Sequence, residues 1–410
     1  MTTETTLEAL DFSALVRPGD RVVWGQAGAE PCALTDRLVQ QAEAIGPFRA
    51  FVGMSLSDRI ASAQAAPIAF QSYCASGVNR ALAKAGRLDI LPCHYSQLAG
   101  ALDPPGVLLL QLAQGPEGLS FGTAAEYLVP LLKSARVVVA EVNAQCPWTF
   151  GETIAPQDID ILVRTDRPLL ELTGPPAGAA EQAIARHVAG LVDDGATLQL
   201  GIGSLPDAIL GGLAGHRDLG IHSGALTEGV VELMQRGVIN NSRKRIDAGV
   251  TVAGALFGGR RLYEFAHRNP QVQLRSTAYT HSQQTLREVH GLVTLNAAIE
   301  VDLTGQINAE VAGGAYVGAV GGAMDFLRGA HSVPGGLPIV ALPSTAAGGK
   351  LSRIVAQLSG PVSSPRADAG IIVTEHGVAD LRGRTLRERM RSMIAIAHPD
   401  FREALQSACS

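Results

Sequence analysis

Short apolar runs that each lead into a glycine-bearing turn and then a helix recur along this chain. Arg21–Trp24 is expected to be a buried strand that runs into the turn Gly25–Pro31, and a helix is expected from Cys32. Thr197–Leu200 leads in the same way into the turn Gly201–Pro206 and another helix. Strands that alternate with helices are typical of parallel sheets, which bind ligands at the carboxyl ends of their strands. The pattern predicts an α/β fold with mostly parallel sheets.

The other expected elements follow the same scheme. An amphipathic helix is expected at Ala180–Asp194. Further strands are expected at Gly106–Leu112, Ala135–Val142, Leu219–His222, Gly291–Asn296, Ile339–Leu342 and Ala369–Val373, each a short run rich in β-branched residues or leucine.

The length of the chain predicts more than one core. A chain of 410 residues is too long for one ordinary hydrophobic core, which favours two α/β domains. The stretch Arg167–Gly178 carries three prolines between periodic segments and is the best candidate linker. We therefore expect an N-terminal domain over residues 1–176 and a C-terminal domain over residues 177–410.

Charge and hydropathy patterning argue against several classes of partner. The formal net charge is -5, so nothing suggests a nucleic acid or an anionic membrane surface, and the basic run Arg243–Arg245 is expected to be a solvated loop. No apolar run is long enough to span a bilayer, and the polar N-terminal stretch Met1–Asp11 has no signal-peptide pattern. A cytoplasmic location is expected.

The cysteines indicate neither disulfides nor a structural metal site. There are five, an odd number without a CxxC pair, at Cys32, Cys74, Cys93, Cys146 and Cys409. We expect no metal cofactor. Cys146, beside Pro147, is a candidate nucleophile, but nothing near it in the sequence lowers its pKa, so a buried inert thiol is the favoured interpretation.

The segment Gly313–Lys350 is the richest in glycine. Runs of glycine allow backbone N–H groups to converge on an anion or a thioester carbonyl, and Arg328 and Lys350 could neutralise phosphates. The alternative is that these glycines only form turns and close helix–sheet contacts. The candidate ligand-binding residues here are Gly318, Gly321, Gly322, Arg328, Ser344, Thr345, Gly348, Gly349 and Lys350.

Several longer motifs resemble one enzyme family. Ile221–Ser223, Ala298–Gln306, Thr374–Gly377 and Ala397–Arg402 are similar to motifs of the acetyl-CoA hydrolase/CoA-transferase family, which includes 4-hydroxybutyrate CoA-transferases. The resemblance covers nearly the whole chain. It implies two related CoA-transferase-like (NagB/RpiA-type) α/β domains, an acyl-CoA held mainly by the second domain, an active-site cleft between the domains, and a homodimer.

The chain departs from the family pattern where the family carries carboxylates. The resemblance implies a nucleophilic glutamate just before Tyr279, but Ala278 stands there, and His281 replaces an asparagine. Gly224 replaces the glutamate of a His-Ser/Thr-Glu-Met motif. Alanine cannot act as a nucleophile, so the usual glutamyl-CoA intermediate has no covalent carrier at position 278. Tyr279 itself matches the pattern and is a candidate acyl-CoA contact.

An acyl-CoA site without a nucleophile can still support direct attack on the thioester. This reaction needs oxyanion donors, for which we favour the N–H groups of Gly321 and Gly322, and a base for the incoming group. The candidate bases are His281, His94 and Glu30. Their alternatives are a solvated loop histidine at His281, a structural histidine at His94 and a helix cap at Glu30.

These features favour an N-acyltransferase that passes the acetyl group of acetyl-CoA directly to a small amine. One branch similar to the family, in antimalarial phosphonate biosynthesis, is such an N-acetyltransferase, and it implies a nucleotide-linked aminoalkylphosphonate as acceptor. The alternatives are an acyl-CoA hydrolase, a CoA-transferase with a replaced nucleophile, and a non-catalytic CoA-binding protein.

Overall fold

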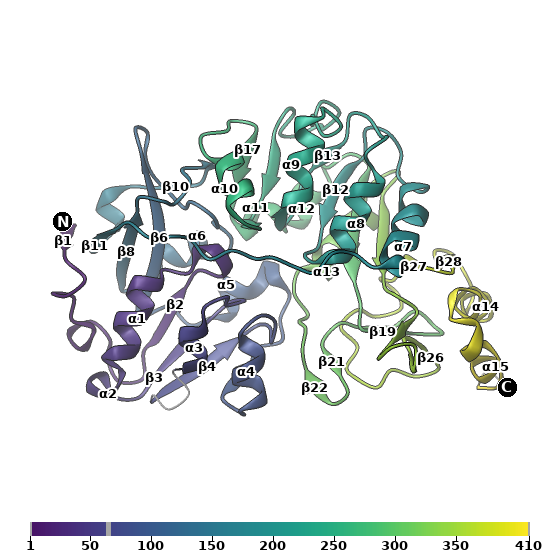
Figure 1. Ribbon diagram of the computed structural model, residues 1–410, viewed down its shortest axis with the longest axis horizontal. Helices are drawn as coiled ribbons and strands as arrows, with labels where there is room; N and C mark the ends of the chain where they lie inside the picture. The colour runs from purple at the N-terminus through teal and green to yellow at the C-terminus, as the bar shows by residue number, and fades with distance from the viewer. Residues whose placement is uncertain (1, 63–66, 409–410) are drawn as a thin grey trace. The chain divides into compact units, whose positions relative to one another are not determined.

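The computed structural model describes residues 2–62 and 67–408, so Cys409 lies outside the described residues (Figure 1). The chain forms two compact units, Met1–Thr173 with Val252–Thr280, and Gly174–Thr251 with His281–Ser410. The break at Thr173 lies inside the predicted linker. The expected domains, 1–176 and 177–410, differ from these units over residues 174–176, at the boundary, and over residues 252–280, because this second segment packs with the first unit.

The first unit is built on a parallel sheet. Its strand order is β1 (Thr3–Thr5), β11 (Ile161–Thr165), β8 (Val137–Asn143), β6 (Val107–Gly115), β2 (Arg21–Trp24), β3 (Phe48–Phe51), β4 (Ile68–Ser72) and β5 (Leu88–Ile90), with every neighbouring pair parallel. The short strand β7 (Gly118–Ser120) pairs antiparallel with the carboxyl end of β6, and β10 (Thr153–Ile154) pairs antiparallel with β7. Central strands such as β6 are apolar along most of their length because both faces of the sheet are buried.

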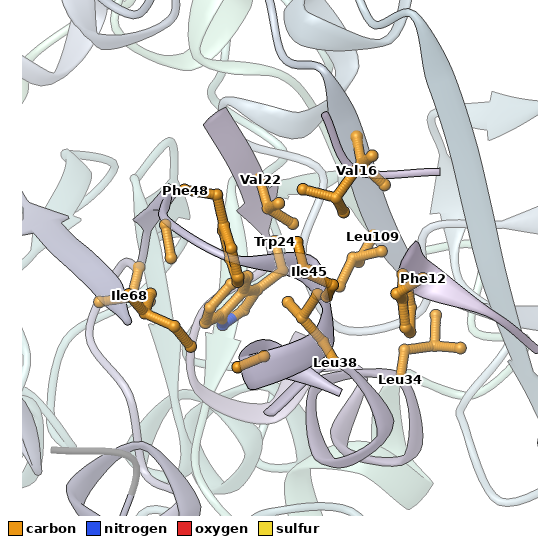
Figure 2. Close-up of a cluster of buried hydrophobic side chains, with 14 of the residues drawn as sticks. Phe12, Val16, Val22, Trp24, Leu34, Leu38, Ile45, Phe48, Ile68 and Leu109 are labelled. Carbon is orange, nitrogen blue, oxygen red and sulfur yellow. The ribbon is translucent and has the colours of Figure 1, made fainter. Parts of the chain in front are cut away.

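Helices cover this sheet and complete a core. They are α1 (Cys32–Gln40), α2 (Ala42–Ile45), α3 (Asp58–Ser62), α4 (Asn79–Lys84), α5 (Leu98–Ala101), α6 (Leu128–Leu132), α10 (Arg260–Ala266) and α11 (Thr277–Thr280). Figure 2 shows Leu34 and Leu38 of α1 among the same buried side chains as Val22 and Trp24 of β2. The segment 252–280 also adds β17 (Val272–Leu274), which pairs in parallel with β9 (Phe150–Gly151).

The second unit has its own mostly parallel sheet. The order is β13 (Gly220–Ile221), β12 (Thr197–Leu200), β18 (Leu292–Ala297), β23 (Leu337–Ala341), β27 (Ile371–Thr374) and β28 (Gly377–Asp380), of which only β28 runs antiparallel to its neighbour within this described sheet. The helices are α7 (Ala179–Ala189), α8 (Ser204–Gly212), α9 (Glu228–Gln235), α12 (Gln283–Leu286), α13 (Ala323–His331), α14 (Leu386–Ile396) and α15 (Pro399–Ser407).

Short strands complete the two units. They are β14 (Ala225–Thr227), β15 (Thr251–Ala253), β16 (Ala255–Phe257), β19 (Glu300–Asp302), β20 (Ile307–Asn308), β21 (Val311–Ala312), β22 (Ala315–Tyr316), β24 (Thr345–Ala346), β25 (Leu351–Ser352) and β26 (Ile354–Val355). None of the described helices combines the length and the apolar composition that crossing a membrane requires.

The predicted α/β class with mostly parallel sheets is confirmed. Strands β2 and β12 have the predicted bounds to the residue. Helix α7 ends at Ala189, earlier than the predicted Asp194, because the chain leaves the helix at the C-cap Gly190. The carboxyl ends of the second sheet lead into the motifs singled out in the sequence, such as Ser344 after β23 and Glu375 after β27.

The basic run Arg243–Arg245 is not simply a solvated loop. Lys244 is 5% exposed, and its ammonium group donates hydrogen bonds to the carbonyl oxygens of Ile221, at 2.9 Å, and Val250, at 2.6 Å. Burial lowers the pKa of Lys244 from 10.5 to about 8. Lys244 therefore anchors the loop to the end of β13, and only its two arginine neighbours are exposed.

Candidate functional site

Glu30 is a buried carboxyl in the turn after β2. The residue is 1% exposed, and its Oε2 accepts a hydrogen bond of 2.7 Å from the hydroxyl of Ser55. Its Oε1 is also buried and has no hydrogen-bond partner among the described residues. Burial raises the pKa of Glu30 from 4.5 to about 7, against the opposing effects of Ser55, Ser57 and Arg167. Such a carboxyl exchanges its proton near neutral pH, which suits a general base.

The Glu30 side chain does not cap α1. The N-cap of this helix is Pro31, and no side chain caps it. The backbone of Glu30 makes the local contact instead, because its carbonyl oxygen accepts a hydrogen bond of 2.9 Å from the N–H of Cys32. The carboxyl group is thus left for another role.

The turn that carries Glu30 is held from several sides. A Cβ atom on Gly28 would lie 2.4 Å from the hydroxyl oxygen of Tyr263, so only glycine fits there. The side-chain amide of Gln111 donates to the carbonyl oxygen of Gly28 at 2.6 Å, and Arg167 donates to the carbonyl oxygen of Glu30 at 3.1 Å. These contacts fix the position of the carboxyl group within the first unit.

A second buried carboxyl, Glu126, was not singled out by the sequence. It lies with φ at 30° and accepts a hydrogen bond of 2.7 Å from the amide of Gln26, which also donates to the hydroxyl of Tyr95 at 2.8 Å. The hydroxyl of Tyr73 donates to the same Gln26 side chain at 2.8 Å. Burial raises the pKa of Glu126 to about 7. No local pattern marks this residue, because its partners come from distant parts of the chain.

The helix that carries Ala278 packs beside Glu126. The N–H of Thr277 donates to the backbone oxygen of Glu126 at 3.1 Å. Ala278 is exposed and offers only its methyl group. The guanidinium carbon of Arg275 lies 4.7 Å from the centre of the Tyr279 ring, a cation–π contact that orients the tyrosine.

His94 lies on an element that touches the same cluster. It is the N-cap residue of the 3₁₀ helix Tyr95–Gln97, and its carbonyl oxygen accepts a hydrogen bond of 2.9 Å from the N–H of Gln97. The imidazole is half-buried, and its Nδ1 has no hydrogen-bond partner among the described residues. His94 therefore stays a candidate base.

In the second unit, the predicted oxyanion donors lie at the start of α13. Gly321 has φ at 58°, a conformation that favours glycine, and Gly322 is the N-cap of α13 without a side-chain cap. The first N–H groups of a helix have no partner inside it. Gly318 differs, because a Cβ atom there would lie 2.0 Å from the carbonyl oxygen of Ala309. Close backbone packing therefore explains the glycine at position 318. This is the alternative, given above, that some of these glycines serve only turns and close contacts.

His281 is not a solvated loop residue. It is 3% exposed, and the centre of its ring lies 4.6 Å from that of Phe326 in α13. Burial, followed by the nearby His222, lowers the pKa of His281 from 6.5 to about 3. The imidazole is uncharged at neutral pH and too weak a base to draw a proton from an amine. Its place beside α13 points to a positioning role.

Two candidate phosphate-binding residues have partners within the second unit. Arg328 is paired with both carboxylate oxygens of Asp368, at 3.1 and 3.2 Å. The N–H and hydroxyl groups of Ser344 both donate to the carboxylate of Glu375, at 2.7 and 2.6 Å. A phosphate would have to compete with these carboxylates.

The hairpin between β24 and β25 is more open. After Thr345 the chain turns through three successive residues with positive φ, which are Ala347 at 50°, Gly348 at 66° and Gly349 at 86°. Lys350 follows and is exposed. Consecutive N–H groups in such a turn can form an anion-binding concavity, so this hairpin is the stronger candidate for a CoA phosphate.

Comparison with known proteins follows the same motifs. Residues 258–409 match the model of the acetyl-CoA hydrolase/transferase C-terminal domain. The 4-hydroxybutyrate coenzyme A transferase of Clostridium kluyveri is 38% identical over 404 residues, which cover 94% of this chain and 93% of the relative. The chain belongs to the acetyl-CoA hydrolase/transferase family.

Other proteins are similar along most of the chain. A succinyl-CoA:cyclohexane-1-carboxylate CoA transferase of Geobacter metallireducens is 36% identical over 83% of this chain and 80% of its own length. The crystal structure of RipA from Yersinia pestis has a TM-score of 0.93 at 33% identity, with 99% of this chain and 96% of that chain covered. The 4-hydroxybutyrate CoA-transferase of Porphyromonas gingivalis has a TM-score of 0.84 at 33% identity, covering 99% and 97%.

Membership of the acetyl-CoA hydrolase/transferase family makes the chain an enzyme that acts on CoA thioesters. Within the family fold, Cys146 is 6% exposed, and burial raises the pKa of its thiol to about 12. It is therefore a buried thiol that stays protonated at neutral pH and cannot replace a missing nucleophile. The predicted cleft between the domains and the predicted homodimer stay predictions.

Proposed function

We propose that this family member transfers the acetyl group of acetyl-CoA directly to a small amine. One observation carries the proposal: the two positions where the family pattern has a glutamate hold Gly224 and Ala278. A carboxylate is the group that would take CoA from the thioester, so a chain without one at these positions needs another route. Direct transfer is the route that needs no carrier on the enzyme.

The proposed step forms one bond and breaks one bond. The amine nitrogen attacks the thioester carbonyl, the carbon–sulfur bond breaks, and CoA leaves as its thiol after receiving the proton that the amine gives up. N–H groups of Gly321 and Gly322 are the proposed donors to the oxygen that becomes negative. This part of the proposal rests on their place at the start of α13.

Glu30 is the proposed base. An amine arrives at neutral pH as an ammonium ion, which must lose a proton before it can attack. A buried carboxylate with one unpartnered oxygen and a pKa of about 7 suits both the attraction of the ammonium and the removal of its proton. Arg167 is tied to the backbone of the same turn and helps hold the carboxyl in place.

The proposed acceptor class follows from the resemblance given above. It is a primary amine on a small anionic molecule, with a nucleotide-linked aminoalkylphosphonate as the first choice to assay. Simple amines without a phosphonate belong in the same assay, because they show whether the amine alone is enough for transfer.

A second candidate is transfer of CoA between carboxylic acids. It is favoured by the relatives themselves, which are named CoA transferases and match this chain along most of its length. It requires a nucleophilic carboxylate outside positions 224 and 278. Acyl-CoA hydrolysis, with water as the acceptor, is the simplest variant of direct attack.

The test follows release of free CoA thiol from acetyl-CoA. Release that depends on an added amine, with an N-acetylated product by mass spectrometry, supports the proposal. Release that depends on an added carboxylate, together with a glutamyl residue trapped by borohydride, would establish CoA transfer instead. Release with neither acceptor would establish hydrolysis, and either of these results overturns amine acetylation.

A further inference from the structure

A cavity of the second unit lies at the amino ends of three parallel strands. Its volume is about 600 Å³, and its lining includes Gly195, two residues before β12, Gly291, just before β18, and Leu337, the first residue of β23. Ser344 and Glu375 of the candidate site follow the carboxyl ends of β23 and β27. Because these strands run parallel, the cavity lies at the opposite edge of the sheet from those two residues.

Two arginines of one loop line this cavity. They are Arg243 and Arg245, and the buried Lys244 stands between them. The ammonium group of Lys244 donates to two backbone carbonyl oxygens, and a Cβ atom on Gly220 would lie 2.8 Å from Cγ of the lysine. The glycine therefore makes room for the lysine stem. With the lysine fixed inside the protein, both guanidinium groups are presented to the cavity.

A second anchor fixes the same loop. Asn241 is 1% exposed, and its side-chain oxygen accepts a hydrogen bond of 2.9 Å from the N–H of Ile221. Its amide donates to the hydroxyl of Thr251 at 3.0 Å, and its backbone oxygen accepts from the N–H of Gly249 at 3.0 Å. The loop is thus held at both ends without a ligand, so little of its conformational freedom remains to be lost when a ligand binds.

One part of the cavity offers hydrogen-bond donors. The side chains of Arg245 and His290 line it and make no hydrogen bond or ion pair with another residue of the described chain. Ile246, which follows Arg245, packs against a buried cluster that includes Val289, the residue before His290. The arginine and the histidine are therefore brought to neighbouring parts of the lining, where both can donate to one anionic group.

Another part of the cavity offers acceptors. Asp193 and Asp194 line it, and Oδ1 of Asp194 already accepts a hydrogen bond of 2.8 Å from a backbone N–H. Arg243 lies beside them, because a Cβ atom on Gly195 would be 3.1 Å from its Cγ, and it also forms an ion pair of 3.6 Å with Asp218. A bare anion would be repelled by these carboxylates, whereas hydroxyl groups would donate to them.

We infer that this cavity binds a small organic phosphate that carries free hydroxyl groups, either a sugar phosphate or a nucleotide. Arg245 and His290 hold the phosphate, and Asp193 accepts hydrogen bonds from the hydroxyl groups. The planar guanidinium group matches the geometry of phosphate oxygens, and the volume lies within the range of about 300–1,000 Å³ typical of small-molecule sites. The site is separate from the one proposed for acetyl-CoA and does not depend on the proposed function.

Calorimetric titration of the full chain tests the site, with CoA present in excess so that the thioester site is filled. The probes are ribose 5-phosphate, adenosine monophosphate and inorganic phosphate. Inorganic phosphate should bind about tenfold more weakly than the better organic phosphate, because it brings no hydroxyl groups to Asp193. Tighter binding of adenosine monophosphate than of ribose 5-phosphate would identify a nucleotide site, and equal binding a sugar-phosphate site. If neither organic phosphate binds, the inference is overturned.

Variants place the binding in the cavity. Arg245→Gln should weaken the binding of both organic phosphates by about tenfold, and Asp193→Ala should weaken them without weakening inorganic phosphate. The control is Arg186→Gln, which removes an exposed arginine of α7 outside the lining and should bind as the wild type does. All three positions are exposed, so Tm should stay nearly unchanged. Equal affinity in Arg245→Gln and the wild type, or an equal loss in Arg186→Gln, would show that the cavity is not the site.

Discussion

Glu30 and Glu126 carry carboxyl groups in surroundings where a charge is unfavourable. Each has a pKa of about 7, and burial is the largest cause in both. They differ in their partners. Glu126 receives the amide of Gln26, whereas Oε1 of Glu30 receives no hydrogen bond from the described residues. Buried polar atoms nearly always have a hydrogen-bond partner, so this oxygen of Glu30 is the one available to accept a hydrogen bond from a ligand.

Substitution Glu30→Gln tests the base. The amide keeps the shape of the side chain but cannot take a proton, so kcat should fall by about 10²-fold or more. The acidic limb of the wild-type pH profile, near the pKa of about 7, should disappear in the variant. Steady-state kinetics between about pH 5 and about pH 9 would show both the fall in kcat and the loss of the acidic limb.

The control for this variant is Glu43→Gln, which changes an exposed carboxyl in α2 of the same unit and should leave the kinetics unchanged. His94→Ala is the competing experiment. If it lowers kcat by about 10²-fold while Glu30→Gln does not, the base is the histidine.

The two carboxyls also predict how stability depends on pH. In the folded chain each holds its proton up to about pH 7, whereas in the unfolded chain the proton leaves near the ordinary pKa of 4.5. Unfolding therefore releases protons between these values, and stability falls as pH rises from about 4.5 to about 7. Each carboxyl contributes on the order of 3 kcal/mol to this fall.

Urea unfolding at a series of pH values would measure this dependence. The variant Glu126→Gln should reduce the fall in unfolding free energy across the window, because the amide has no proton to lose. A fall as steep in the variant as in the wild type would show that Glu126 titrates normally.

At the scale of single elements, glycines of one short segment serve different purposes. Gly318 lets the chain pass against Ala309, whereas Gly322 begins α13 with φ at -92°, which any residue can adopt. Packing requires the glycine at position 318. The backbone conformation does not require one at position 322, so a bound ligand is the proposed reason for Gly322. Sequence motifs cannot separate these two uses, because both appear as glycine.

Substitutions at these two positions should therefore separate folding from catalysis. Gly318→Ala should lower Tm measurably, since its Cβ atom would lie 2.0 Å from a backbone oxygen that cannot rotate away. Gly322→Val should leave Tm nearly unchanged and abolish turnover by filling the space at the helix start. Full turnover in Gly322→Val would remove these N–H groups as oxyanion donors.

For the whole molecule, each of the two units has its own sheet and its own candidate residues. Carboxyl candidates gather in the first unit, and the glycine segment and α13 belong to the second. The boundary between units falls between Thr280 and His281, so the short stretch 277–281 supplies residues to both.

Binding of acetyl-CoA should protect the second unit selectively. A ligand that binds only the folded chain raises the free energy of unfolding, and with it Tm. At a free ligand concentration of one hundred times Kd the gain is about 2.7 kcal/mol. Hydrogen exchange should slow in the segments around Gly322 and Lys350, while α1 in the first unit exchanges as before. Protection confined to the first unit would place the thioester elsewhere.

The sequence by itself determined the strands and the missing carboxylates. Buried parallel strands such as Arg21–Trp24 and Thr197–Leu200 are apolar runs ended by glycine turns, a local signal that needs no partner to be visible. Positions 224 and 278 were likewise evident because the surrounding motifs fix their place in the pattern. Both kinds of information are carried by neighbouring residues.

Only the tertiary structure decided the states of the polar groups. Burial raises the pKa of Glu126 to about 7, although the hydrogen bond from Gln26, one hundred residues away in the chain, opposes this shift. Ser344 is bonded to Glu375 rather than to a ligand. The neutral, buried state of His281 and its contact with Gly224 arise in the same way. Burial and hydrogen bonding depend on which distant segments pack together, and local patterns in a sequence do not record that.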